Sequence, residues 1–177
     1  MPDSPLHIRR ATAADADTVA ELAAALAQSF PFSRAAFDQS YPAVLAAADA
    51  CLLLATNGRQ PATDGAPPAT GGGPPATGGG QPATDGGEDP VGYLLGFRHP
   101  AFFANAPVAW VEEILVRPEY RGRGAGRALM SAFEQHAADQ GCALVALATR
   151  RAAAFYSALG YQESASYFRK VLGGSAG

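Results

Sequence analysis

The sequence predicts one mixed α/β domain, in which helices flank a central β-sheet. Three observations support this fold class. The chain has 177 residues and 48% of them are hydrophobic, which is enough for a single sizeable core. Short apolar runs bounded by glycine or proline alternate with segments whose apolar residues recur every three or four positions. After residue 106 these segments follow the order strand, helix, strand, helix, strand, which favours helices packed on a sheet.

The N-terminal part predicts one strand and two helices, at residues 7–10, from residue 12 or 15 to about residue 28, and near residues 34–47. Thr12 or Asp15 can cap the first helix and Ser33 the second, because such side chains accept backbone hydrogen bonds. Pro42 lacks a backbone N–H, so we expect it to kink or interrupt the second helix.

A low-complexity insertion separates two apolar runs. Between Asn57 and Pro90 the chain has no Val, Ile, Leu, Met or aromatic residue, and Pro-Ala-Thr recurs with a period of seven. Such a segment cannot bury enough apolar surface to offset its ordering entropy, so we expect residues 57–90 to be disordered. The flanking runs, Cys51–Thr56 and Val91–Phe97, read as two strands of a hairpin whose turn has been expanded. The whole chain, residues 1–177, is then a single domain.

The remaining elements are expected as strands at residues 107–116, 143–148 and 162–171, and as helices at residues 124–140 and 152–159. Between the first strand and the first helix lies a glycine-rich turn. Helix N-termini present unpaired N–H groups and partial positive charge, and glycine lets an anion approach the backbone closely. Arg121 and Arg123 add fixed charge for phosphate oxygens. The turn from Arg121 to Gly126 is therefore predicted to bind a phosphate or pyrophosphate.

Spacing narrows the kind of phosphate site. The Gly-Lys-Ser/Thr of a Walker loop is absent, and the third glycine of the dinucleotide fingerprint is replaced by Arg127. The pattern present is Arg121-x-x-Gly124-x-Gly126, and it follows Val116-Arg117-Pro118. It resembles the pyrophosphate loop of the GNAT superfamily of N-acetyltransferases. A second block resembles the same superfamily, with matches at Ala152, Phe155, Tyr156, Gly160 and Tyr161 and a departure at Thr149, where the family has Asn.

The resemblance implies a GNAT-like acyltransferase fold and an acetyl-CoA-dependent N-acetyltransferase that moves acetyl directly to a primary amine, with a small molecule favoured as acceptor. A protein or peptide amine, and a catalytically silent acyl-CoA-binding module, are the alternatives. The residues implied in cofactor binding are Leu115 and Val116 by main-chain contacts, then Arg121, Gly122, Arg123, Gly124, Ala125, Gly126, Arg127 and Thr149.

Three side chains are the catalytic candidates. The resemblance places Tyr156 beside the sulfur of coenzyme A, as the acid that protonates the leaving thiolate. Glu112 and Glu113 lie in an apolar strand, an expensive place for carboxylates unless they face a wet cleft. Glu112 is favoured as the base and Glu113 as a cation-binding partner. Strand alternation sends them to opposite faces unless a bulge intervenes.

Composition excludes several other classes. The net charge of −3 argues against a general nucleic-acid binder, and the chain has no apolar run long enough to span a membrane. No Cys, His or Asp cluster has metal-ligand spacing. Cys51 and Cys142 are expected as buried free thiols of a cytoplasmic protein, with a disulfide or metal pair as the alternative. A homodimer is compatible with the sequence.

Overall fold

A computed structural model of the chain describes residues 6–27, 30–58 and 89–172. Within these residues five strands form one sheet, in the order β1 (Leu6–Arg10), β2 (Ala50–Asn57), β3 (Asp89–His99), β4 (Val108–Val116) and β5 (Val145–Leu147). Neighbouring strands are antiparallel from β1 to β4, whereas β5 is parallel to β4. The predicted fold class, a mixed sheet flanked by helices, is confirmed.

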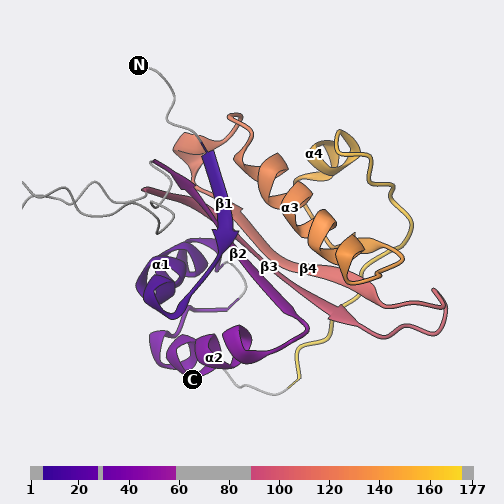
Figure 1. The fold of residues 1–177 in the computed structure, drawn as a ribbon, viewed down its shortest axis with the longest axis horizontal. Coiled ribbons are helices and arrows are strands. Elements are labelled where there is room, and N and C mark those ends of the chain that lie inside the picture. The colour runs from indigo at the N-terminus through magenta and orange to yellow at the C-terminus, as the bar shows by residue number, and fades with distance from the viewer. Residues whose placement is uncertain (1–5, 28–29, 59–88, 173–177) are drawn as a thin grey trace, which may run out of the picture.

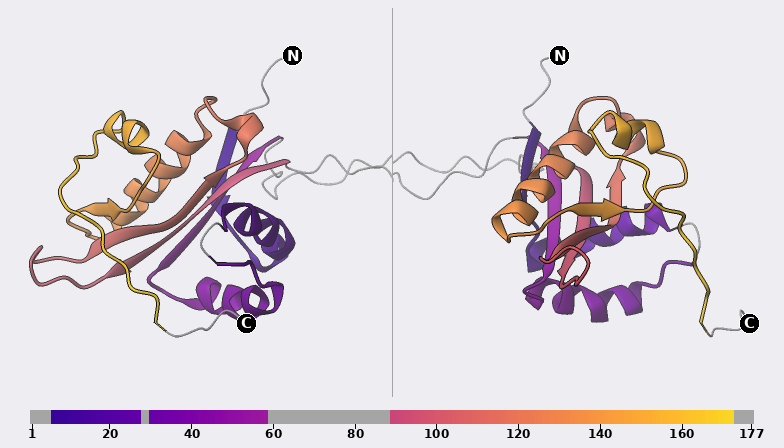
Figure 2. Two further views of the ribbon diagram at one scale, coloured as in Figure 1. Left: turned by 180° about the vertical axis from the view of Figure 1, so that it is seen from behind. Right: turned by 90° about the vertical axis from the view of Figure 1, so that its right-hand side faces the viewer.

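The helices lie on both faces of the sheet, as Figures 1 and 2 show. One face carries α1 (Ala16–Leu26) and α2 (Arg34–Ala46), and the other carries α3 (Ala125–Asp139) and α4 (Ala153–Ser157). Short 3₁₀ turns at Ala13–Asp15 and Pro118–Tyr120 precede α1 and α3. No helix in the described part of the chain is long and apolar enough to cross a membrane.

Asp15 and Ser33 stand at the N-termini of α1 and α2, where capping residues were expected, but of the two only the Ser33 side chain caps its helix. The Asp15 carboxylate accepts from the Thr12 backbone N–H at 2.7 Å and from Arg9 at 2.7 Å. These hydrogen bonds, that of Arg9 first, lower the pKa of Asp15 to about 2. The Ser33 hydroxyl accepts from the Ala36 N–H at 3.3 Å and caps α2.

The expected interruption at Pro42 is wrong, because α2 continues through this residue to Ala46. The preceding side chain explains why the helix tolerates it. Tyr41 is 5% exposed, and its hydroxyl donates to the Thr12 carbonyl at 2.7 Å. Tertiary packing therefore fixes this turn of the helix against the local preference of proline.

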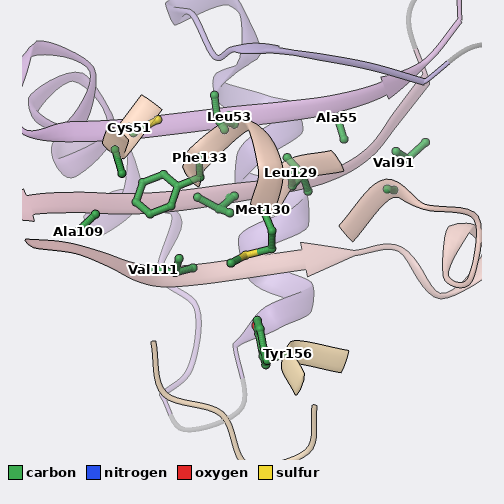
Figure 3. Packing of buried hydrophobic residues seen from close by; sticks show 13 residues of the cluster. Cys51, Leu53, Ala55, Val91, Ala109, Val111, Leu129, Met130, Phe133 and Tyr156 are labelled. Atoms are coloured by element: carbon green, nitrogen blue, oxygen red, sulfur yellow. The ribbon is translucent and has the colours of Figure 1, made fainter. Parts of the chain in front are cut away.

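The core consists of two apolar clusters, one on each face of the sheet. The cluster under α3 includes Leu129, Met130 and Phe133, all at most 1% exposed (Figure 3). Gly96 of β3 makes room for it, since a Cβ there would lie 2.3 Å from the Phe133 ring. The cluster under α1 and α2 includes Leu54 and Tyr93. Sheet alternation thus distributes apolar side chains to both helical layers.

The hairpin predicted around the insertion is present. β2 and β3 pair antiparallel, from Ala50 opposite Phe97 to Asn57 opposite Asp89. Residues 59–88, which carry the Pro-Ala-Thr repeats, lie outside the described residues. The predicted disorder of this segment therefore stays a prediction, and the described residues on either side of it, Asn57 and Asp89, are strand partners.

Replacing residues 59–88 with a short glycine-containing turn should leave the melting temperature unchanged or a few degrees higher. Asn57 and Asp89 are already strand partners, so a tight turn can join them, and each halving of a loop removes about 0.6 kcal/mol of closure entropy. Asp89 is retained because the Tyr120 hydroxyl donates to its carboxylate. Thermal unfolding followed by circular dichroism is the measurement. A drop of about 10 °C would show that the segment stabilises the domain.

The expected strand at residues 162–171 is wrong. Residues 162–172, the C-terminal segment, form no strand or helix and are exposed throughout. A strand needs a partner that offers a ladder of hydrogen bonds, and β5 spans only Val145–Leu147. The segment instead leaves α4 and runs past β4 toward the side of the sheet that carries α2 (Figures 1 and 2). Its alternating apolar residues, including Tyr167 and Phe168, are largely exposed.

Candidate active site

The sheet opens between β4 and β5. Only three pairs join the two strands, from Ala109 opposite Val145 to Val111 opposite Leu147. β4 continues to Val116, so its edge from Glu112 onward has no strand partner on this side among the described residues. An unpaired edge presents backbone N–H and C=O groups to an extended ligand, in the manner of an added strand.

The register decides which backbone groups face this open edge. The Arg117 N–H donates to the Val91 carbonyl of β3 at 2.8 Å. Backbone groups alternate between sides along a strand, so those of Leu115 also face β3, and those of Ile114 and Val116 face the opening. The register therefore makes the main chains of Ile114 and Val116 accessible from the open edge. The sequence had suggested main-chain contacts from Leu115 and Val116.

The glycine-rich turn lies at the end of this edge. Gly122 and Gly124 have φ values of +75° and +90°, a left-handed conformation that favours glycine, and a Cβ at either would meet nothing within 4 Å. The first hydrogen bond of α3 runs from the Ala128 N–H to the Gly124 carbonyl at 2.9 Å. The amide groups of residues 125–127 precede this bond and point out of the helix end. Open space, free amides and helix polarity would favour an anion at this turn, the predicted anion cradle.

The arginines predicted to bind the anion lie in or next to this turn in the sequence. Arg121, Arg123 and Arg127 are exposed, and the Arg121 Nε donates to the Val116 carbonyl at 3.1 Å. The Arg123 guanidinium lies 5.8 Å from the centre of the Tyr120 ring. Ala125 differs from its neighbours, because its side chain is 3% exposed and belongs to the core. It can contribute only its backbone to the cradle.

Gly126 has a packing role. A Cβ at this position would lie 3.2 Å from the Phe155 ring of α4 and 3.8 Å from Val116. The absence of a side chain thus lets α4 approach α3 beside the open edge of β4. Thr149 supports the same helix, since its hydroxyl oxygen accepts from the Ala152 N–H at 3.1 Å where α4 begins.

Tyr156 extends from α4 toward β4, as Figure 3 shows. The side chain is 8% exposed and sits between Phe155 and Tyr161, with ring centres 5.0 and 5.9 Å away. Burial raises the pKa of the Tyr156 phenol, so it keeps its proton at neutral pH. No described residue forms a hydrogen bond with its hydroxyl, whereas the Tyr161 hydroxyl donates to Glu134 at 2.8 Å. Within residues 6–27, 30–58 and 89–172, no acceptor thus holds the Tyr156 proton.

A β-bulge determines how the two glutamates lie. Leu95 of β3 pairs with Glu113 and Gly96 pairs with Val111, which leaves Glu112 as an extra residue. The expectation of simple alternation therefore does not apply here. Glu113 turns to the face of α1 and α2 and accepts from the Tyr93 hydroxyl at 2.6 Å. Desolvation, with the Glu113 charge beside it, raises the pKa of Tyr93. Glu112 is exposed and lines a surface cavity of about 450 Å³ that is open to solvent, with largely exposed residues around it.

The segment that contains the open edge and the glycine-rich turn matches a known protein family. The model of the acetyltransferase (GNAT) family matches residues 71–161, more than half of the chain. The chain belongs to the GNAT family. The resemblance seen in the sequence motifs is thereby confirmed, and the match includes β3, β4, the glycine-rich turn and α4.

Two curated relatives of this GNAT domain match over shorter segments. Identity is 40% over 58 residues with the thialysine N-epsilon-acetyltransferase of Bos taurus, which covers 30% of this chain and 34% of that protein. It is 36% over 78 residues with an aminoglycoside N(6')-acetyltransferase type 1 of Stenotrophomonas maltophilia, which covers 41% of this chain and 51% of that protein. The alignments thus span about a third and a half of these relatives' lengths.

Solved structures of other proteins resemble this chain over nearly its whole length. The aminoglycoside N-acetyltransferase AAC(6')-Iy in complex with CoA has a TM-score of 0.69 and 20% identity, covering 96% of this chain and 98% of that one. The glucosamine-6-phosphate N-acetyltransferase of Arabidopsis thaliana has a TM-score of 0.71 and 16% identity, covering 96% and 100%. At these identities the likeness establishes the fold.

Other candidates from the sequence lie outside the opening. Cys51 is buried and Cys142 is half-buried, and both are free thiols. Over residues 6–27, 30–58 and 89–172, no three His, Cys, Asp or Glu side chains gather to hold a metal ion. Sequence reasoning missed Ile114 and the charged residues of the C-terminal segment. Strand period and hairpin register give Ile114, but no sequence signal places the C-terminal segment beside Glu112.

Proposed function

We propose that this GNAT domain transfers acetyl from acetyl-CoA directly to a primary amine of a small molecule. The observation that carries the proposal is the unpaired edge of β4, which leads at Val116 into the anion cradle at the start of α3. A long ligand with amide groups at one end and a pyrophosphate at the other fits this path. Coenzyme A has this chemistry, and its acetyl thioester supplies an activated acyl group.

The residues present are suited to this ligand. Ile114 and Val116 would pair with the amides of the pantetheine arm through their main chains. The left-handed turn at Gly122 and Gly124 would let the pyrophosphate approach the amides of residues 125–127. Arg121, Arg123 and Arg127, exposed at the entrance, would add charge for its oxygens, and Thr149 offers a hydroxyl beside α4.

Two proton transfers accompany acetyl transfer. An alkylammonium has a pKa near 10 and must lose a proton before its nitrogen can attack a carbonyl carbon. Glu112 would accept this proton, because it is exposed to the cavity beside the open edge. As the new C–N bond forms, the C–S bond breaks, and Tyr156 would donate its proton to the departing sulfur. The raised pKa of Tyr156 keeps that proton available.

Glu113 is proposed as a cation-binding partner. The hydrogen bond from Tyr93 at 2.6 Å holds its carboxylate in place on the α1 and α2 face of β4. A fixed negative charge one residue from the proposed base would attract the acceptor's ammonium group. It would contribute similarly before and during the reaction, so its effect belongs mainly to binding.

The substitution Gly124→Val tests the cradle. It places a β-branched side chain at φ +90° and fills the space that the pyrophosphate would occupy, so acetyl-CoA affinity should fall at least about tenfold, or 1.4 kcal/mol. Isothermal titration calorimetry is the measurement. Gly141→Val is the matched control, because Gly141 has φ +72° and open space at the other end of α3. Equal affinity of Gly124→Val and wild type would remove the cradle from the proposal.

The activity itself is tested by thiol release from acetyl-CoA across a panel of small primary amines. Direct transfer predicts release of one thiol for each amine acetylated, and none without an acceptor. Release with a peptide N-terminus or a lysine side chain, and not with any small amine, would instead favour a protein acceptor. Tight acetyl-CoA binding without release for any acceptor would contradict an enzyme.

A further inference from the structure

The cavity beside Glu112 combines charges of both signs. The extra residue of the β4 bulge contributes a carboxylate, and the C-terminal segment contributes Arg169 and Lys170. Phe30, from the connection between α1 and α2, and Tyr167 add aromatic surface. Segments far apart in the sequence thus meet around one space, and two aliphatic side chains of the C-terminal segment complete its lining.

These charges do not neutralise one another. Among the described residues, the side chains of Glu112, Arg169 and Lys170 form no ion pair within 4 Å and no hydrogen bond. The carboxylate and the two cations therefore line the same cavity without contacting one another and are available to a ligand. Two adjacent cations repel each other, and an anion placed between them relieves that repulsion. Arginine also binds carboxylate and phosphate through two parallel hydrogen bonds.

The position of Glu112 orients a ligand in this space. It is the first residue of β4 beyond the pairing with β5, so it lies where the open edge begins. An ammonium group bound to Glu112 would therefore lie next to the acyl donor, and an anionic group on the same molecule would extend toward Arg169 and Lys170. The cavity is open to solvent, and its volume of about 450 Å³ leaves room for a small molecule.

We propose that the acceptor is a small primary amine that also carries an anionic group, either a carboxylate or a phosphate. This inference rests on the proposed acetyl transfer and specifies its substrate class. Glu112 receives the ammonium end, Arg169 and Lys170 hold the anionic end, and Phe30 and Tyr167 flank the chain between them.

Matched amine pairs test the inference. Thiol release is measured with 4-aminobutyrate against butylamine, and with O-phosphoethanolamine against ethanolamine. At least one anionic member should have a KM about tenfold or more below that of its neutral partner, and the pair with the larger ratio identifies the anionic group. Equal KM values within both pairs would overturn the inference, while thiol release itself would leave acetyl transfer standing.

Substitutions of Arg169 and Lys170 test whether these two residues bind the anionic group. Arg169→Gln and Lys170→Gln should each raise the KM of the preferred anionic amine severalfold and together about tenfold, with the neutral amine within twofold of wild type. Arg169→Lys should retain part of the preference. Arg151→Gln is the control, because Arg151 is an exposed cation that does not line the cavity. An unchanged preference in the double variant would overturn the assignment. Thiol release with neither member of either pair, in wild type, would overturn both the substrate class and the proposed transfer to such amines.

Discussion

Replacing Tyr156 by phenylalanine is expected to lower turnover by about 10²- to 10⁴-fold while acetyl-CoA binding persists. The ring would keep its contacts with Phe155 and Tyr161, so only the hydroxyl is lost. That hydroxyl has no hydrogen-bond partner among the described residues, which leaves its proton free for the departing thiolate. Steady-state thiol release gives kcat, and calorimetry gives acetyl-CoA affinity.

Tyr161→Phe is the matched control for this experiment. Tyr161 packs against Tyr156, but its hydroxyl donates to Glu134 instead of facing the opening. Loss of that hydrogen bond should cost about 1 kcal/mol of stability and leave kcat within a few-fold of wild type. A fully active Tyr156→Phe enzyme would show that another group, or water, protonates the thiolate.

Replacing Glu112 by glutamine is expected to lower kcat/KM by about 10²-fold or more at neutral pH, with much of the loss recovered at high pH. The amide cannot accept the ammonium proton, but above the acceptor's own pKa the free amine already exists. The wild-type enzyme should therefore exceed the variant near neutral pH, where the carboxylate is ionised and the amine protonated, and the two profiles should converge as pH rises toward about 10. A pH–rate profile with one good amine measures this. Superimposable profiles would exclude Glu112 as the base.

Glu113→Gln separates the two carboxylates. Glutamine retains an oxygen that can accept from the Tyr93 hydroxyl, so the packing of the α1 and α2 face should be preserved. Loss of charge should raise the KM for the acceptor with little change in kcat, because a cation-binding group acts equally in the ground and transition states. A strong pH-dependent loss of kcat in Glu113→Gln, with none in Glu112→Gln, would reverse the two roles.

Local sequence signals were reliable where the backbone itself has a strong preference. The left-handed turn at Gly124 follows from glycine, and the helix after it follows from apolar spacing between residues 125 and 139. The hairpin was predictable because two short apolar runs flank a segment that cannot enter a core, and β2 and β3 pair with their ends together. Such features depend on a few neighbouring residues, so the sequence contains enough information to place them.

The predictions that were wrong concern segments whose structure depends on residues distant in the sequence. Proline disfavours the continuation of α2, yet the buried Tyr41 and its bond to Thr12 hold the helix together. Alternation predicted a strand at residues 162–171, but the neighbouring β5 is three residues long and leaves that segment without a ladder. In each case tertiary packing or its absence outweighs a local preference of about 1 to 3 kcal/mol.

The sequence by itself was enough to identify the family, and it also proposed the anion-binding turn and the candidate residues Tyr156, Glu112 and Glu113. Only the tertiary structure decided the orientation of these side chains. The register between β3 and β4 inserts a bulge at Glu112, sends Glu113 to Tyr93 and turns Ile114 to the open edge. A one-residue change in pairing exchanges the faces of every side chain that follows, and that change depends on how β4 pairs with β3, not on the residues of β4 alone.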